Sequence, residues 1–169
     1  MNRRLRMQGA SSAAERQAGN PVKARERRVM KLETVLVPVD GSEPSRRAAA
    51  YAADLAKAMS ANILLVHCHR RFPSVLGEPY YQKAVTEIIE DANELLEPYR
   101  QILGQAGVPF SERILERPAG AAIVEIARIE GCDLVVMGSR GRTDLEGLLL
   151  GSVTHRVLES SPCPVLVIR

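Results

Sequence analysis

The chain has 169 residues, 46% of them hydrophobic, which is enough for one domain with a sizeable core plus an extension. No apolar stretch reaches about 18 residues, the length of a membrane-spanning helix, and no secretory hydrophobic segment opens the sequence, so we expect neither a membrane span nor a signal peptide. The net charge of +3 divides unevenly, because residues 1–32 carry +7 and the remainder carries −4. The chain's basicity is therefore no evidence that the folded part binds nucleic acid, and we do not expect it to.

Residues 1–30 lack sustained apolar periodicity and are rich in Arg, Ala, Ser and Gln, so we predict a disordered, basic N-terminal extension. Three interpretations of it stay open. The segment could be solvated and inert, or it could touch anionic surfaces such as nucleic acid or lipid headgroups. It could also lie outside the natural protein, since Met30 would make a sensible start just before the first strand. The folded domain is expected to span residues 31–169.

Short apolar runs alternate with stretches of helical periodicity after residue 33. Five runs rich in Val, Ile and Leu have the composition and length of strands. The predicted strands are residues 34–39, 62–68, 109–116, 134–137 and 164–168. The predicted helices are residues 43–60, 80–106, 119–130 and 153–158. Pro98 is expected to kink or divide the second helix.

Strands that alternate with helices require a parallel sheet with right-handed crossovers and helices on both faces. We therefore predict an α/β fold with a doubly wound parallel sheet. The first helix is expected to bury one face against this sheet. The apolar residues of that face are Ala48, Tyr51, Ala52, Leu55 and Met59.

The three cysteines, Cys68, Cys132 and Cys163, are scattered and lie in or beside apolar runs. They are odd in number and show no C-x-x-C spacing, which disfavours a disulfide framework or a metal site. We interpret them as buried free thiols in a reducing compartment, which predicts a cytoplasmic protein.

A spaced set of glycines follows the fourth predicted strand. It reads Gly138-Ser-Arg-Gly141, then nine residues, then Gly151-Ser152, where the last helix begins. Backbone N–H groups at a helix start favour anions, glycine lets the main chain approach phosphate oxygens, and the Ser152 hydroxyl adds a donor. The pattern predicts a nucleotide site. Ser152 could also be the N-cap of that helix, a role compatible with phosphate binding.

The first strand ends in a second polar loop, Asp40-Gly41-Ser42. Ligands of doubly wound sheets bind beyond the carboxyl ends of the strands, at the point where strand order switches. If the first and fourth strands are neighbours there, the two loops line one crevice. Ser42 suits the N-cap of the following helix, which leaves Asp40 for a ligand or metal, although Asp40 could instead cap that helix itself.

Together these motifs resemble the ATP-binding branch of the universal stress proteins. The residues that carry the resemblance are Val35 to Ser42, Met137 to Gly141, Gly151-Ser152 and Pro162 to Val167. The resemblance covers residues 31–169 and implies a five-stranded sheet in the order 3-2-1-4-5. It also implies ATP held for regulation more than for turnover, and a homodimer paired through the last strand, at Val165, Leu166 and Val167.

The resemblance further implies roles for individual residues. Pro38 and Val39 would flank the nucleotide, and Asp40 would face the ribose and a magnesium ion at the phosphates. Val66 would contact the adenine, and Met137 would pack near the adenine and the ribose. The residues that would wrap the ribose and phosphates are Gly138, Arg140, Gly141, Gly151, Ser152 and Val153.

Three functions fit this sequence. We favour an ATP-responsive regulatory domain with an unidentified protein partner and at most slow ATP hydrolysis, because the motif lacks the lysine of GxxxxGK[ST] and no catalytic set accompanies it. One alternative is an ATP-using enzyme of the related nucleotide-binding α/β group, although residues 40–44 match neither its HIGH-like nor its SGGxDS-like motif. The other alternative is a dimeric scaffold whose site is unused. We assign no catalytic residue.

Overall fold

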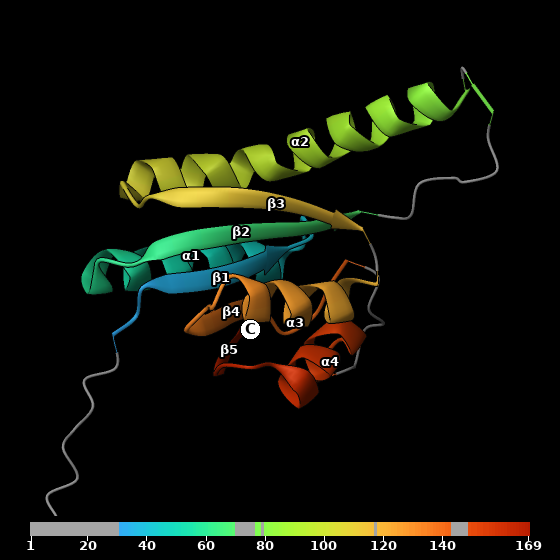
Figure 1. The fold of residues 1–169 in the computed structure, drawn as a ribbon. Helices are drawn as coiled ribbons and strands as arrows, with labels where there is room; N and C mark the ends of the chain where they lie inside the picture. The colour runs from blue at the N-terminus through green and yellow to red at the C-terminus, as the bar shows by residue number, and fades with distance from the viewer. Residues whose placement is uncertain (1–30, 70–76, 79, 117, 143–148) are drawn as a thin grey trace, which may run out of the picture. The chain divides into compact units, whose positions relative to one another are not determined.

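The computed structural model describes residues 31–69, 77–78, 80–116, 118–142 and 149–169, so the predicted disorder of residues 1–30 lies outside the described residues. Residues 31–169 form one compact unit (Figure 1). Its elements are β1 Thr34–Val39, α1 Glu43–Met59, β2 Asn62–His69, α2 Tyr80–Ala106, β3 Phe110–Glu116, α3 Ala119–Ile129, β4 Leu134–Gly138, α4 Ser152–Ser160 and β5 Val165–Ile168. Each lies within two residues of its predicted bounds. Pro98 does not divide α2, which runs as one helix.

The five strands form one parallel sheet in the order β3-β2-β1-β4-β5, which confirms the predicted fold class. Strands β1 and β4 are neighbours, as the crevice prediction required. Their pairing stops at Leu36 and Val135, whereas β1 and β2 stay paired as far as Val39 and His67. The carboxyl ends of β1 and β4 are therefore unpaired with each other, which opens the sheet at its switch point.

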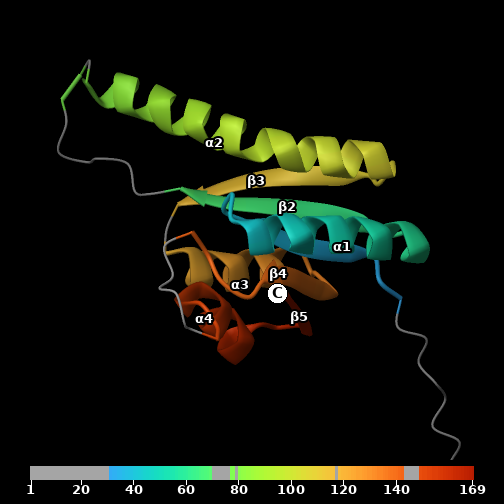
Figure 2. The ribbon, with the colours of Figure 1, turned by 180° about the vertical axis from the view of Figure 1, so that it is seen from behind.

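Helices cover both faces of the sheet, as strand alternation dictates. Val35 and Val37 of β1 pack in the core beneath α1 and α2, whereas Leu36 packs in the core beneath α3 and α4. Figure 1 shows α3 in front of the sheet, and Figure 2, seen from behind, shows α1 in front of it. No helix among the described residues is long and apolar enough to cross a membrane.

The structure confirms only part of the predicted buried face of α1: Ala48 and Ala52 are buried and Leu55 is partly buried, whereas the prediction is wrong for Tyr51 and Met59. Tyr51 and Met59 are 51% and 42% exposed. The residues that α1 buries are Ser45, Ala48, Ala49, Ala52, Ala53 and Ala56. A row of alanines lets this helix lie close to the sheet, which leaves the larger side chains at the margin of the contact.

Candidate functional site

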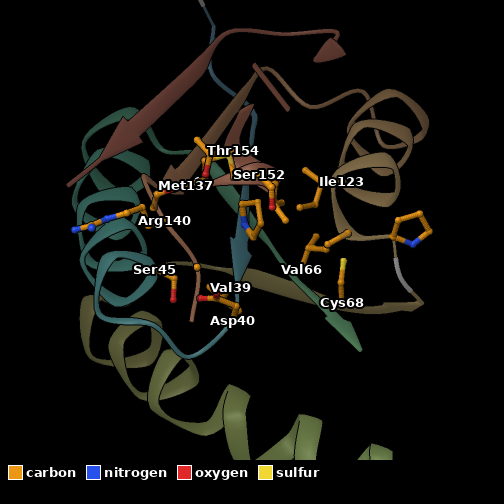
Figure 3. A pocket seen from close by; sticks show the side chains of 16 residues that line it. Val39, Asp40, Ser45, Val66, Cys68, Ile123, Met137, Arg140, Ser152 and Thr154 are labelled. Atoms are coloured by element: carbon orange, nitrogen blue, oxygen red, sulfur yellow. Dashed lines mark hydrogen bonds between the residues drawn. The ribbon is translucent and has the colours of Figure 1, made fainter. Parts of the chain in front are cut away.

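A cavity of about 530 Å³ opens at the carboxyl ends of β1, β2 and β4, beside the first turns of α3 and α4 (Figure 3). Its lining residues are Pro38, Val39, Asp40, Ser45, Val66, Cys68, Pro118, Ala119, Ile123, Met137, Gly138, Arg140, Gly141, Ser152, Val153 and Thr154. The cavity lies at the switch point of the sheet, where ligands of this fold class bind.

The two ends of the cavity differ in chemistry. Val66, Cys68 and Ile123 lie together at one end, and Arg140 lies at the opposite end (Figure 3). Pro118 and Ala119, at the start of α3, add further apolar surface. A molecule that fills this space therefore meets an apolar wall at one end and polar or cationic groups at the other.

Every binding residue predicted from the sequence lines this cavity except Gly151. The N–H of Gly151 donates to the Ser139 carbonyl oxygen over 2.8 Å, so that amide is already used within the protein. Gly151, and not Ser152, is the N-cap of α4, so the N-cap role considered for Ser152 is wrong. Gly151 has no side chain that could accept a capping hydrogen bond, so within the described residues the start of α4 is uncapped. Its first residues, Ser152 to Thr154, line the cavity with an uncapped helix start.

Gly138 serves a packing purpose that the glycine motif did not reveal. A Cβ atom at this position would come within 2.8 Å of the Pro44 carbonyl carbon and 2.9 Å of the Ser45 backbone nitrogen. Any larger residue would push the end of β4 away from the start of α1. Thr154 fixes the same strand end from the other side, because its hydroxyl donates to the Gly138 carbonyl oxygen over 2.9 Å.

Asp40 holds the two loops of the crevice together. Its Oδ1 accepts from the backbone N–H and the hydroxyl of Ser42, at 3.0 and 2.6 Å, and its Oδ2 accepts from the backbone N–H of Arg142 at 2.9 Å. Ser42 in turn is the N-cap of α1. Since each carboxylate oxygen accepts about two hydrogen bonds, only Oδ2 keeps an open position for a ligand or metal.

A buried hydrogen-bond chain supports the Asp40 loop from the far side of the sheet. The N–H of Gly41 donates to the hydroxyl of Tyr99, which is fully buried on α2. The Ser45 hydroxyl donates to the Ser42 carbonyl oxygen over 2.8 Å, so its contact with Tyr99 must use the Tyr99 proton. Burial raises the pKa of Tyr99, which therefore remains a donor at neutral pH.

Sequence reasoning missed Tyr99 and Ser45. Neither residue belongs to a motif that predicted a site: Tyr99 lies within the second predicted helix and Ser45 within the first. A tyrosine on a buried helix face is itself a signal, because its hydroxyl needs a partner there. The identity of that partner depends on how α2 packs, which sequence spacing does not give.

The thiols divide between the core and the cavity. Cys132 is buried, and burial raises its pKa to about 11, while burial also raises the pKa of the partly buried Cys163. Both are therefore protonated at neutral pH, as expected of structural thiols. Cys68 is only partly buried and lines the cavity, so the prediction of three buried thiols holds for Cys132 alone.

Known proteins of similar sequence and similar fold belong to one family. Residues 31–169 match the universal stress protein family. A universal stress protein of Thermus aquaticus is 38% identical over 140 residues, covering 82% of this chain and 99% of the relative. The solved structure of MJ0577, from Methanocaldococcus jannaschii, has a TM-score of 0.73 at 31% identity, covering 83% of this chain and 96% of that one. A solved universal stress protein in complex with cAMP has a TM-score of 0.65 at 26% identity, covering 82% and 98%.

Proposed function

The chain belongs to the universal stress protein family, and from that premise we propose that its cavity binds ATP. The observation that carries the proposal is the pairing of an apolar cavity end with an uncapped helix start. A purine base needs the first, and phosphate groups need the second. The complex of a solved relative with cAMP supports a nucleotide as the ligand class.

In the proposed complex the base lies against Val66 and Ile123, and Met137 packs near the base and ribose. The phosphates lie at the first turn of α4, where the Ser152 hydroxyl and the backbone N–H groups donate to them. Arg140 is exposed, lines the cavity opposite its apolar end and adds a positive charge. Pro38 and Val39 flank the nucleotide, as the family resemblance implies.

Magnesium fits this site as a companion of the phosphates and not as an ion held by the protein alone. Among the described residues no group of three or more His, Cys, Asp or Glu side chains is placed to hold a metal. Asp40 offers one open position, on Oδ2. Mg²⁺ commonly takes one carboxylate, phosphate oxygens and waters, so Asp40 would supply the protein ligand.

We further propose that the protein is a cytoplasmic homodimer whose nucleotide occupancy is sensed by an unidentified regulatory partner. β5 is an edge strand, and its residues, including Val165, Leu166 and Val167, are only partly buried. Such an edge is a ready template for a second strand. Hydrolysis would be slow at most, because the sole carboxylate that lines the described cavity, Asp40, is engaged in holding the loops. Residues 1–30 would be an extension to this domain.

Calorimetric titration of ATP with magnesium into the full chain tests the proposal. Ala119 is partly buried and lines the apolar end of the cavity, so Ala119→Phe should fill the space for the base. We expect ATP affinity to fall at least about a hundredfold, the effect of losing a base pocket.

Ala121→Phe is the matched control, because Ala121 is exposed on the same helix and does not line the cavity. Its ATP affinity should equal that of the unaltered protein. If the unaltered protein does not bind ATP, or if the two variants bind ATP with equal affinity, the proposal is wrong.

A further inference from the structure

A second cavity, of about 1000 Å³, lies at the same sheet edge but on the side covered by α2. We call it the α2 groove. Gly41, Arg46 and Arg142 line it from the loops and α1, and Asp91, Glu94 and Leu95 line it from α2. Asp40 lines both this groove and the cavity of about 530 Å³ described above, which we call the ATP cavity after its proposed ligand. The function proposed above makes no use of the groove.

Arg142 is fixed in this groove at its backbone, and its exposed side chain lies over Gly41. Its N–H donates to Asp40 Oδ2, and its side chain packs over Gly41 next to Leu95. The Arg142 Cδ and Nη1 atoms lie 3.5 and 3.6 Å from the point that a Cβ on Gly41 would occupy. The guanidinium group is therefore positioned beside Gly41.

Arg46 adds a second guanidinium group to the lining of the groove. It belongs to the first turn of α1, where its N–H donates to the Ser42 carbonyl oxygen over 3.1 Å. Its charge acts on the Tyr99 hydroxyl, which accepts from the Gly41 N–H: burial raises the pKa of Tyr99, and Arg46 opposes that rise. Neither Arg46 nor Arg142 forms an ion pair with any other described residue.

The groove also holds three carboxylates, those of Asp40, Asp91 and Glu94. Both oxygens of Asp40 already accept hydrogen bonds from the backbone. Asp91 and Glu94 lie exposed on α2. The groove thus has a basic wall near Gly41 and an acidic, solvent-facing wall on α2. Two arginines that line one groove and form no ion pair with another described residue suit a phosphate group, which they bind through paired N–H donors.

We propose that the α2 groove is a phosphate-binding site in which Arg46 and Arg142 are the ligands. Two kinds of molecule could supply this phosphate group. It belongs either to the distal end of the nucleotide whose base lies in the ATP cavity, an option that rests on the proposed function, or to a separate phosphorylated molecule. Asp40 lines both cavities and holds the Arg142 backbone. In both cases we therefore expect a ligand in one cavity to change the affinity of the other cavity for its ligand.

Inorganic pyrophosphate is the probe for the site itself, titrated into the full chain by calorimetry. The doubly substituted protein Arg46→Gln/Arg142→Gln should bind it at least about tenfold more weakly. Lys57→Gln/Arg128→Gln removes the same charge from exposed positions outside the groove and should bind it like the unaltered protein. Equal affinity in the two double variants, or no binding by the unaltered protein, overturns the proposal.

Comparing ATP with AMP separates the two sources. If the groove takes the distal phosphates, Arg46→Gln/Arg142→Gln weakens ATP and leaves AMP unchanged, and saturating ATP blocks pyrophosphate. If it takes a separate molecule, the same variant leaves ATP unchanged and pyrophosphate binds the ATP-loaded protein. Binding of pyrophosphate through the two arginines without any binding of ATP or AMP would refute the proposed function while supporting the phosphate site.

Discussion

The two cavities at the carboxyl edge of the sheet share a wall but have opposite chemistry. The ATP cavity combines apolar side chains with an uncapped helix start, whereas the α2 groove is lined mainly by charged and imidazole groups along the flank of a helix. Strand alternation produces this difference. Val66 faces the ATP cavity, and the next residue, His67, faces the groove and donates from Nδ1 to the Val39 carbonyl oxygen. Adjacent residues of one strand thus build two different sites.

The comparison also shows what holds the lining shared by the two cavities in place. The Asp40 carboxylate accepts hydrogen bonds from backbone N–H groups of its own loop and of the loop after β4. The neighbouring Gly41 donates its N–H to the hydroxyl of Tyr99 on α2. The same set of hydrogen bonds therefore shapes both cavities. Changes to this wall should disturb both sites, and changes away from it should disturb one.

The largest effect is expected from Gly138→Ala, a substitution in the lining of the ATP cavity. The added Cβ would lie 2.8 Å from the backbone of Pro44, and backbone cannot yield as a flexible side chain can. We expect the free energy of unfolding to fall by about 2–3 kcal/mol in urea denaturation. Gly104→Ala is the control, because it lies inside α2 with nothing within 4 Å, and it should raise stability by about 0.5–1 kcal/mol. Equal stability of Gly138→Ala and the unaltered protein would contradict the packing account.

Asp40→Asn should weaken both sites together. The substitution places an amide donor near the Arg142 N–H or removes an acceptor from Ser42, so the two loops lose one connection. We expect ATP and pyrophosphate each to bind about tenfold more weakly in calorimetry. Asp54→Asn, at an exposed position of α1, should leave both affinities unchanged. Loss of only one affinity would show that Asp40 is not a shared wall.

Tyr99→Phe tests the support of the wall from α2. It leaves the Gly41 N–H and the Ser45 hydroxyl without their buried partner, which should cost about 1–2 kcal/mol of unfolding free energy. Tyr51→Phe removes the same atom from a tyrosine that is 51% exposed and should change nothing. An equal effect of the two substitutions in urea denaturation would show that the buried chain contributes no stability.

The smallest effect concerns the core beneath the ATP cavity. The pKa of Cys132 is raised from 9.0 to about 11, so burial of its neutral thiol stabilises the fold below pH 9. This contribution should disappear as the pH rises from 9 to about 11, because only the unfolded chain ionises freely in that window. Cys132→Ala should therefore lose less stability than the unaltered protein between these pH values. Parallel curves for the two proteins would contradict the assignment.

The sequence allowed the fold to be predicted because local signals and global topology agree. The alternation of Val-rich strands with helices requires a parallel sheet, and the Asp40 and Gly138 loops both follow strands. The site was harder to predict in detail. Gly151 belongs to the motif, but its N–H donates to the Ser139 carbonyl oxygen. Gly138 also belongs to the motif, and the close approach of Pro44 leaves no room for a Cβ there.

The contacts that escaped prediction join residues far apart in the chain. Tyr99 meets Gly41 across 58 positions, and Arg142 meets Asp40 across 102. Their partners depend on how helices pack on the sheet, and no periodicity encodes that information. The α2 groove could not be predicted from the sequence for the same reason. It forms only when α1, α2 and three loops or strand ends come together in the fold.

Backbone amide chemical shifts, followed by NMR while ATP and magnesium are added to the full chain, test the central claim most directly. If the uncapped start of α4 binds the phosphates, the largest changes will fall on the amides of Ser152, Val153 and Thr154, with Ala119 at the base end also moving. A saturating titration that leaves these amides unchanged, or that moves only amides outside the cavity, would contradict the account.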